Sequence, residues 1–283
     1  MATRQLIEQR YTVFGHPIAH SLSPRIHTLF AAQTEQHTMT YTAVDVSEDQ
    51  FETAINDFYQ QGGLGLNCTV PLKLLAFQRA DQLSQRAQRC GAVNTLSLKG
   101  DGTILGDNTD GVGLLRDITH NLNIPIRETK LLILGAGGAT RGILAPLLQE
   151  DPQQIVIANR TVEKALSLAE LFNDLGNVIG CGYDALDGQS FDLIINATAA
   201  SLHNQLPPLP DTALKPSGNC YDLAYGAQPT PFVKWGKQHG ATISVDGLGM
   251  LIEQAAEAFL IWRGVRPNTQ SMIQDDSFRH KVV

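Results

Sequence analysis

A glycine-rich turn after an apolar run has the residue types and spacing that phosphate binding requires. Residues 130–134 predict a buried strand, and Gly135, Gly137 and Gly138 follow it before a helix-like stretch. Such glycines allow a tight turn and bring backbone N–H groups close to a pyrophosphate, while the helix N-terminus adds partial positive charge. Thr140 stands where the third glycine of G-x-G-x-x-G would be, so the match is incomplete. The turn predicts a dinucleotide site; the alternative is a turn that only packs.

A basic residue stands where a dinucleotide-binding unit usually carries an acid for the adenosine ribose. That position follows the next predicted strand, residues 155–158, and the chain has Asn159, Arg160 and Thr161 there, with Lys164 beyond. A guanidinium can bind a 2'-phosphate with two hydrogen bonds, whereas a carboxylate would repel it. The sequence therefore predicts NADP rather than NAD. The alternative for Arg160 is a solvent-facing residue at a helix start.

Two serines lie at the start of a predicted helix near the N-terminus. Ser21 and Ser23 follow the predicted strand 11–15, and Pro24 suits the first turn of a helix. Two hydroxyls beside a helix N-terminus could bind a carboxylate, because backbone N–H groups and the helix dipole favour an anion there. We also expect Ser23 to be the N-cap of the helix, and one hydroxyl cannot fill both roles completely.

Two further side chains have the chemistry for proton transfer. Lys73 follows the predicted strand 64–70, at the edge where open α/β sheets place ligand contacts, although most lysines simply face solvent. Asp110 lies in a turn-rich run in which we expect Asp107 to cap a helix that starts near Val112. The residues alone leave the role of Asp110 open.

Strand-like and helix-like stretches alternate along the chain. The predicted strands are residues 11–15, 41–45, 64–70, 91–98, 103–106, 130–134, 155–158, 191–196, 221–225 and 241–245. This alternation is typical of an α/β protein with parallel strands, and 283 residues favour two domains. We expect a connecting helix over 114–122 and a kink at Pro146 in the helix after the glycine turn.

The composition excludes several classes of function. The net charge is -7 and no run of Lys and Arg occurs, which argues against nucleic acid as a partner. The four cysteines are scattered without metal-ligand spacing, so we expect reduced thiols and no metal. The N-terminus has no apolar h-region, and no apolar run approaches the ~20 residues of a membrane span. We therefore expect a cytoplasmic protein whose partners are small molecules.

Together these motifs resemble those of the shikimate dehydrogenase family, in the family's order and over essentially the whole chain. The matching stretches are residues 15–24 (GHPIAHSLSP), 67–73 (NCTVPLK), 91–95 (GAVNT), 106–111 (GDNTDG), 135–139 (GAGGA), 159–161 (NRT) and 246–251 (DGLGML) through Gln254. The resemblance implies reversible reduction of 3-dehydroshikimate to shikimate with NADP, in chorismate biosynthesis. It also implies an α/β fold with an N-terminal open α/β substrate domain (1–112 and 246–283) and a Rossmann-like, parallel-sheet NADP domain (113–245), joined by a C-terminal helix that returns to the first domain.

The resemblance also assigns roles to individual residues. Lys73 and Asp110 would be the catalytic pair. The substrate would be bound by Ser21 and Ser23 through its carboxylate, and by Asn67, Thr69, Lys73, Asn94, Asp110, Tyr225 and Gln254. The cofactor would be bound by Gly135, Ala136, Gly137, Gly138, Ala139, Asn159, Arg160, Thr161, Lys164, Thr198, Leu223, Gly247 and Met250, with Gly249 also near the nicotinamide. The protein would be a monomer or a homodimer.

One loop departs from the family's pattern. The family usually has Asn-Ala-Thr-Ser-x-Gly after the third strand of the NADP domain, whereas this chain has Asn-Ala-Thr-Ala-Ala-Ser over residues 196–201. The loss of a serine hydroxyl and of a glycine should change the loop beside the cofactor.

Several alternatives stay open at this point. A lysine amine has a reference pKa of about 10.4 and is a poor base near neutral pH, so Lys73 needs either burial or joint proton transfer with Asp110. His16 and His20 are rival bases, because histidine titrates nearer neutrality. A quinate/shikimate dehydrogenase and a non-catalytic ligand sensor of the same fold are rival functions. An intact lysine–aspartate pair argues against the sensor.

Overall fold

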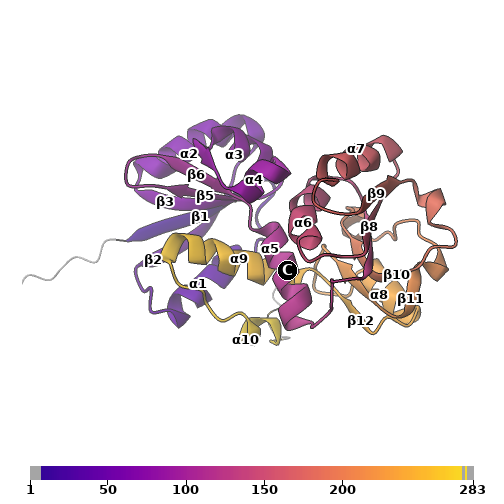
Figure 1. Ribbon diagram of the computed structural model, residues 1–283. Helices are drawn as coiled ribbons and strands as arrows, with labels where there is room; N and C mark the ends of the chain where they lie inside the picture. Colours follow the sequence, from indigo (N-terminus) through magenta and orange to yellow (C-terminus); the bar gives the residue numbers. More distant parts are fainter. Residues whose placement is uncertain (1–7, 276–277, 279–283) are drawn as a thin grey trace, which may run out of the picture. The chain divides into compact units, whose positions relative to one another are not determined.

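The computed structural model describes residues 8–275 and 278, which form two compact units (Figure 1). Residues 1–7 lie outside the described residues. They belong to the N-terminal segment in which we expect no signal peptide. The first unit extends to Thr109 and includes Gln254–Ser271, and the second contains Asp110–Glu253 and the residues after Ser271. The chain thus divides after Thr109 and after Glu253, whereas the sequence placed the divisions after residues 112 and 245.

The first unit contains a six-stranded mixed sheet in the order β2-β1-β3-β5-β6-β4. Its strands are β1 (Gln9–Gly15), β2 (Met39–Asp45), β3 (Gly63–Cys68), β4 (Gln82–Leu83), β5 (Thr95–Leu98) and β6 (Ile104–Asp107). β1 is parallel to β2 and β3, whereas β5 is antiparallel to β3 and β6. The carboxyl ends of β3 and β6 and the amino end of β5 therefore meet at one edge, where Thr95 pairs with both Asn67 and Asp107.

Helices cover this first sheet. They are α1 (Ser23–Gln33), the 3₁₀ turn η1 (Glu48–Gln50), α2 (Phe51–Gln60), α3 (Lys73–Arg79), α4 (Gln85–Cys90) and the second part of α9 (Leu248–Arg263), with α10 (Gln270–Ile273) after it. As the helical spacing predicts, Phe51 and Ile55 of α2 are fully buried and join Phe14 and Leu66 in one apolar core. Leu29, which we expected on the apolar face of α1, is exposed.

The second unit contains an all-parallel sheet in the order β12-β11-β10-β7-β8-β9. Its strands are β7 (Lys130–Leu134), β8 (Gln154–Ala158), β9 (Val178–Cys181), β10 (Phe191–Asn196), β11 (Leu214–Asp222) and β12 (Ile243–Val245). Leu131 and Ile133 of β7 pack in one apolar core, and Leu132 and Leu134 pack in another on the opposite face. Burial on both faces explains the uninterrupted apolar run and confirms the predicted α/β class.

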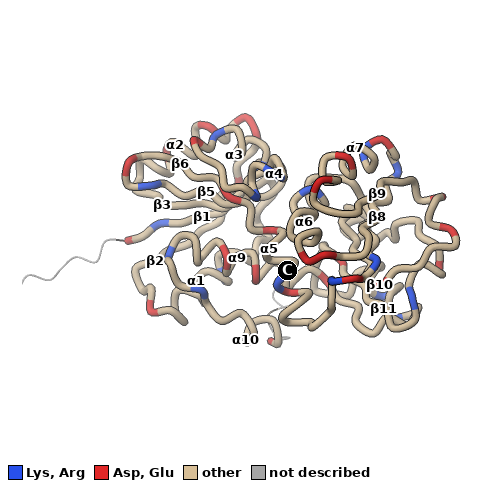
Figure 2. The backbone as a smooth tube through the Cα atoms, viewed as in Figure 1, with Lys and Arg blue, Asp and Glu red and all other residues tan. Residues whose placement is uncertain are grey.

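Helices and turns connect these parallel strands. They are α5 (Asp110–Arg116), the π-helical turn η2 (Asp117–Asn121), α6 (Gly138–Leu148), α7 (Val162–Phe172), the 3₁₀ turns η3 (Tyr183–Leu186), η4 (Ala200–His203) and η5 (Asp211–Ala213), α8 (Pro231–Gln238) and the first turns of α9. Figure 2 shows the basic and acidic residues dispersed along the described backbone of each unit, without one continuous basic stretch.

The structure corrects the extent of one predicted helix and places Pro146 inside another, as expected. The helix expected over 114–122 begins earlier, at Asp110, and passes into a π turn at Asp117. Pro146 lies inside α6 and cannot donate a hydrogen bond to the carbonyl of Gly142. A Cβ at Gly111 would lie 2.5 Å from that carbonyl oxygen and 2.7 Å from Cγ of Pro146. The close packing of α5 on α6 therefore requires a glycine at 111.

Two predicted strands also differ in extent. β11 ends at Asp222, so Leu223 and Tyr225, which we expected in a strand over 221–225, lie in the connection after it. The strand expected over 91–98 begins only at Thr95. Backbone hydrogen bonds to the neighbouring strands still continue for one residue in both places, at Asn94 and at Leu223.

Candidate active site

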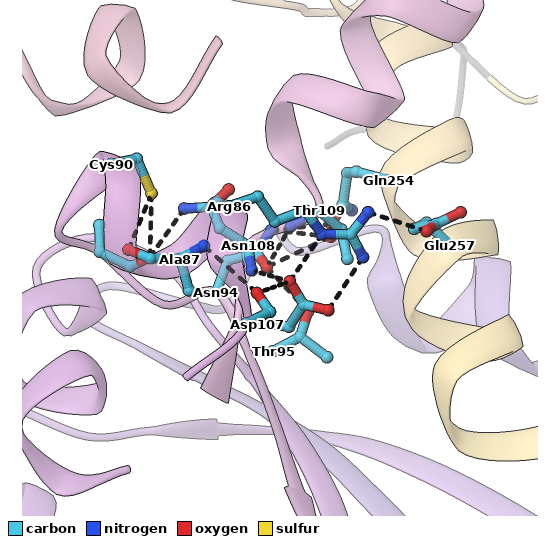
Figure 3. Close-up of polar contacts among 12 residues, drawn as sticks. Arg86, Ala87, Cys90, Asn94, Thr95, Asp107, Asn108, Thr109, Gln254 and Glu257 are labelled. Carbon is cyan, nitrogen blue, oxygen red and sulfur yellow. Dashed lines mark hydrogen bonds and ion pairs between the residues drawn. The ribbon is translucent and has the colours of Figure 1, made fainter. Parts of the chain in front are cut away.

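Two of the predicted substrate-binding side chains, Asn94 and Gln254, meet Thr109 at the edge of the first sheet. Asn94 Nδ2 donates to Thr109 Oγ1 at 2.9 Å and to Gln254 Oε1 at 3.4 Å, and Thr109 Oγ1 donates to Gln254 Oε1 at 3.3 Å. Figure 3 shows Gln254 on its helix turned toward Asn94 and Thr109. A segment after β6 and a helix 145 residues further on thus contribute to one polar cluster.

Asn67 joins this cluster at the end of β3, and its amide group is fully engaged as a donor. Its Nδ2 donates to the carbonyl of Asn94 and to Thr95 Oγ1, both at 3.0 Å, and its Oδ1 accepts from Tyr41 Oη at 2.6 Å. The side chain is only 7% exposed. A carbonyl oxygen has two lone pairs, so Asn67 offers a ligand an acceptor rather than a donor. This chemistry suits a ligand hydroxyl.

Sequence reasoning missed Tyr41, because a tyrosine in the middle of a strand carries no local signal of function. Its ring stacks on His27 at 4.1 Å between centroids and 5° between planes, and both residues are buried. Burial and the nearby Cys68 raise the pKa of Tyr41 above its ordinary value, and a hydrogen bond with Ser23 opposes them. Tyr41 therefore links α1 and β3 at the candidate site.

The two serines lie at the start of α1, but Ser23 is not the N-cap. Leu22 occupies that position, and Ser23 is the first helical residue, 8% exposed. The Ser23 N–H donates to Ser21 Oγ at 3.3 Å, so it is Ser21 that satisfies a free donor of the first turn. Our prediction for Ser23 was wrong because Leu22 already has helical dihedral angles.

Thr69 lies in the loop after β3, close to the end of β1. A Cβ at Gly15 would overlap the Thr69 methyl group and would lie 3.2 Å from the Val70 carbonyl oxygen. Only glycine allows these two strand ends to approach so closely. His16, the next residue, pairs with Asp45 at 2.5 Å at the end of β2.

Asp107 does not cap a helix, contrary to our expectation. Its Oδ1 accepts from Ser84 Oγ at 2.5 Å and from Arg86 Nε at 2.6 Å, and its Oδ2 accepts from Arg86 Nη2 at 2.9 Å. The carboxylate is thus turned toward α4 (Figure 3). Burial lowers the pKa of Arg86, but the carboxylates of Asp107 and Glu257 outweigh this effect and raise it. No local signal in the sequence pointed to Arg86.

Each residue of the predicted catalytic pair is the first residue of a helix. Lys73 is the first residue of α3 in the first unit, half-buried, and its carbonyl accepts from the N–H of Val93 at 3.0 Å. Asp110 is the first residue of α5 in the second unit and is also half-buried. Each follows a strand along the chain: Lys73 comes after β3, and Asp110 comes after β6.

The glycine turn connects β7 to α6 as predicted. Gly135 has φ +101°, where glycine is favoured, and a Cβ there would lie 3.1 Å from Cγ2 of Thr198. Gly137 is the N-cap of α6 and has no side chain that could cap the helix. A Cβ at Gly137 or Gly138 would meet nothing within 4 Å. Exposed backbone N–H groups at the start of an 11-residue helix fit a pyrophosphate.

Two cations follow β8, where the sequence predicted recognition of a 2'-phosphate. Arg160 and Lys164 are exposed, the first two residues before α7 and the second in its first turn. Asn159 holds the approach to this helix: its Nδ2 donates to the Thr161 carbonyl at 2.8 Å and its Oδ1 accepts from the N–H of Ala136 at 3.2 Å. Asn159 thus connects the glycine turn to the residues that follow β8.

The residues expected near the nicotinamide also lie together. The Leu223 N–H donates to the Asn196 carbonyl at 2.9 Å, and the Gly247 N–H donates to the Ala224 carbonyl at 3.1 Å. A Cβ at Gly247 would overlap the Leu223 carbonyl, so a side chain has no room there. Tyr225, which we expected to contact substrate, lies in this second unit, half-buried, and burial raises its pKa.

The loop that departs from the family's pattern has its own anchor. Ser201 Oγ donates to Asp222 Oδ2 at 2.6 Å and accepts from Asn196 Nδ2 at 3.2 Å. Thr198 bonds to Asn196 Oδ1 through both its N–H and its hydroxyl, at 3.1 and 2.7 Å. The serine therefore ties the loop to the end of β11 where the family usually has a glycine.

The part of the chain that the structure describes contains neither a metal-binding group nor a membrane-spanning helix. No group of three or more His, Cys, Asp or Glu side chains there could hold a metal ion. None of the helices in that part of the chain is long and apolar enough to cross a membrane.

Comparisons with known proteins cover nearly the whole chain. Family models match residues 13–96 (shikimate dehydrogenase substrate binding domain), 117–204 (shikimate/quinate 5-dehydrogenase) and 247–274 (shikimate 5'-dehydrogenase C-terminal domain). The shikimate dehydrogenase (NADP(+)) of Methylococcus capsulatus is 63% identical over 265 residues, 94% of this chain and 95% of that protein.

Solved structures agree with these matches. The Ael1 enzyme of Pseudomonas putida has a TM-score of 0.87 at 48% identity and covers 94% of this chain and 97% of its own. The shikimate 5-dehydrogenase of Thermus thermophilus in complex with NADP(H) and shikimate has a TM-score of 0.83 at 33% identity, over 97% of this chain and 100% of its own. On its sequence and its fold, the chain belongs to the shikimate dehydrogenase family.

Proposed function

We propose that this protein is an NADP-dependent shikimate dehydrogenase that reduces 3-dehydroshikimate reversibly to shikimate, in chorismate biosynthesis. The observation that carries the proposal is the buried polar cluster of Asn67, Asn94, Thr109 and Gln254, which offers hydrogen-bonding groups for ring hydroxyls at the carboxyl edge of the first sheet. The high identity to relatives named for this activity supports it. We infer that the first unit binds the substrate and the second binds NADP.

The substrate-binding groups have distinct tasks in this proposal. Ser21 and Ser23 bind the carboxylate at the start of α1, since hydroxyls and helix N–H groups favour an anion. The ring hydroxyls are bound by Asn67, Thr69, Asn94 and Gln254, and Tyr225 of the second unit also binds the substrate. Asn67 acts as an acceptor, because both of its amide hydrogens are already used.

Reduced NADP supplies a hydride to the carbonyl carbon when it is bound. Lys73 and Asp110 deliver the proton to the carbonyl oxygen, and in the reverse direction they remove it from the hydroxyl. We propose that the two residues move this proton jointly.

The cofactor-binding residues divide into three groups. The pyrophosphate lies against Gly135, Ala136, Gly137, Gly138 and Ala139, the 2'-phosphate against Asn159, Arg160, Thr161 and Lys164, and the nicotinamide side against Thr198, Leu223, Gly247 and Met250. We further propose a cytoplasmic location and a monomer or homodimer.

Nicotinamide absorbance tests the activity directly. Pure protein is mixed with NADP or NAD and with shikimate or quinate. We expect NADP to be reduced when shikimate is present. Comparable rates with quinate would favour a quinate/shikimate dehydrogenase, and no reduction in any combination would favour a ligand sensor.

Two variants test the catalytic pair. Lys73→Ala should lower kcat by about 100-fold or more while changing the shikimate KM much less, because general acid–base catalysis contributes about 10²–10⁴-fold. Asp110→Asn should lower kcat by nearly as much. Normal turnover in the Lys73 variant would remove this assignment and return His16 and His20 to consideration.

A further inference from the structure

We propose that Arg86 is a positioning residue for substrate binding, which holds Thr109 and Gln254 in place through Asp107 and Glu257. The inference rests on the proposed function, because it explains how the substrate-binding cluster of that function is fixed. Arg86 itself belongs to α4 and lies in none of the motifs on which the resemblance rests.

The three hydrogen bonds of Arg86 reach two different elements. Nε and Nη2 bind the two oxygens of Asp107, at 2.6 and 2.9 Å, and Nη1 binds Glu257 Oε1 at 3.0 Å. Figure 3 shows the guanidinium between the carboxylate at the end of β6 and the one on α9. A planar guanidinium can make such a two-oxygen contact and still donate a third bond, which an ammonium cannot reproduce.

The contact with Asp107 sets the position of Thr109. Asp107 is the last residue of β6, and its Oδ1 also accepts from the N–H of Asn108 at 2.7 Å. Thr109 follows directly, and its N–H donates to Asn94 Oδ1 at 2.9 Å. A carboxylate fixed by Arg86 therefore fixes the turn that brings Thr109 to Asn94.

The contact with Glu257 sets the position of Gln254. The two residues are three positions apart on α9, so they lie on neighbouring parts of the same helix face. Gln254 Oε1 accepts from both Asn94 and Thr109. Arg86 thus connects the two segments whose side chains meet in the substrate-binding cluster.

The ion pairs of Arg86 with Asp107 and Glu257 are partly buried and therefore differ from surface ion pairs. The side chains of Arg86, Asp107 and Glu257 are 27%, 11% and 14% exposed. Solvent screens buried charges less than exposed ones, and removing one partner leaves the others unpaired in a partly buried place. The geometry of the cluster should therefore depend on the whole guanidinium and not only on its charge.

Arg86→Lys and Arg86→Met test this role, and Arg266→Met is the matched control. Arg266 Nη1 binds the other oxygen of Glu257 at 2.6 Å, so its removal leaves the hydrogen bonds from Arg86 to Asp107 in place. We expect both Arg86 variants to raise the shikimate KM by about 10-fold or more. The NADP KM should stay within about twofold, because the two lost hydrogen bonds to Asp107 support only the substrate-binding cluster. Arg266→Met should raise the shikimate KM less than either Arg86 variant, because the hydrogen bonds from Arg86 to Asp107 and to Glu257 remain.

A double-mutant cycle with Gln254→Ala separates positioning from general destabilisation. If Arg86 acts largely through Gln254, Arg86→Lys should raise the shikimate KM much less in the Gln254→Ala background than in the wild type. Equal effects in both backgrounds would overturn the proposed link. So would a wild-type shikimate KM in Arg86→Lys, which keeps the charge and serves if Arg86→Met fails to fold. Wild-type protein that neither binds nor oxidises shikimate would overturn the proposed function as well, whereas active wild type with unchanged Arg86 variants would overturn the positioning role alone.

Discussion

The hydroxyl of Tyr221 donates to the buried carboxylate of Asp117 at 2.7 Å and accepts from the backbone N–H of Met250 at 3.1 Å. Asp117 is 2% exposed, and burial is the main reason why its pKa is raised. A Cβ at Gly249 would overlap the same carboxylate. The end of β11, the π turn and the first turn of α9 are therefore joined around one carboxylate, next to the proposed cofactor residue Met250.

Tyr221→Phe should weaken NADP binding as well as the fold. The change removes a donor from the buried Asp117 and the acceptor of the Met250 N–H, which should cost about 1–3 kcal/mol of unfolding free energy. Because Met250 would lose its anchor, the NADP KM should rise more than the shikimate KM. Denaturant unfolding and steady-state kinetics measure the two effects, and equal changes in both KM values would contradict the assignment.

Ser201→Gly, which restores the residue that the family usually has, should loosen the loop beside the cofactor. The buried carboxylate of Asp222, fully inaccessible to solvent, would lose one of its donors, at a cost of about 1–2 kcal/mol. The NADP KM should rise because Thr198 lies in the same loop. Ser167→Ala, at an exposed position of α7, is the control and should change stability by less than about 0.5 kcal/mol. A Ser201 variant as stable as this control would show that the anchor is dispensable.

Local signals predicted the parts of the structure that depend on neighbours in sequence. The glycine turn at Gly135 and the apolar run of β7 were read correctly, because turn and strand signals extend over a few residues. Asp107 was misread as a cap because its partner Arg86 lies 21 residues earlier, and no pattern in the sequence connects them. Contacts between residues so far apart in the sequence form only when the fold brings their elements together, and Tyr41 was missed for the same reason.

Tyr41→Phe should affect substrate binding more than its effect on stability alone would suggest. The variant keeps the ring on His27 but leaves Asn67 Oδ1 without the Tyr41 donor, so Asn67 is held in the cluster only through its two Nδ2 hydrogen bonds. We expect a shikimate KM several-fold higher and an unchanged NADP KM. Tyr59→Phe is the control, because the buried Tyr59 hydroxyl has no hydrogen-bond partner among the described residues. Equal kinetics in the two variants would contradict a role for Tyr41.

His27 should make the protein less stable in mild acid. It is completely buried among Tyr41, Phe30, Phe259 and Trp262, and burial lowers its pKa from 6.5 to about 3. Below pH 6.5 the unfolded chain therefore binds a proton that the folded chain does not, so this group costs stability as the pH falls toward 3. The loss should reach about 2 kcal/mol at pH 5.

Unfolding free energies at pH 7 and pH 5 measure this loss in the wild type and in His27→Phe. A phenyl ring cannot take up a proton, so the decrease between the two pH values should be smaller in the variant by about 2 kcal/mol, whatever the substitution costs in packing at either pH. The comparison within each protein removes that packing cost, because it is the same at both pH values. His37→Asn, at an exposed histidine, should keep the wild-type decrease. If His27→Phe also keeps it, the acid sensitivity of the fold arises elsewhere and the buried imidazole is not its source.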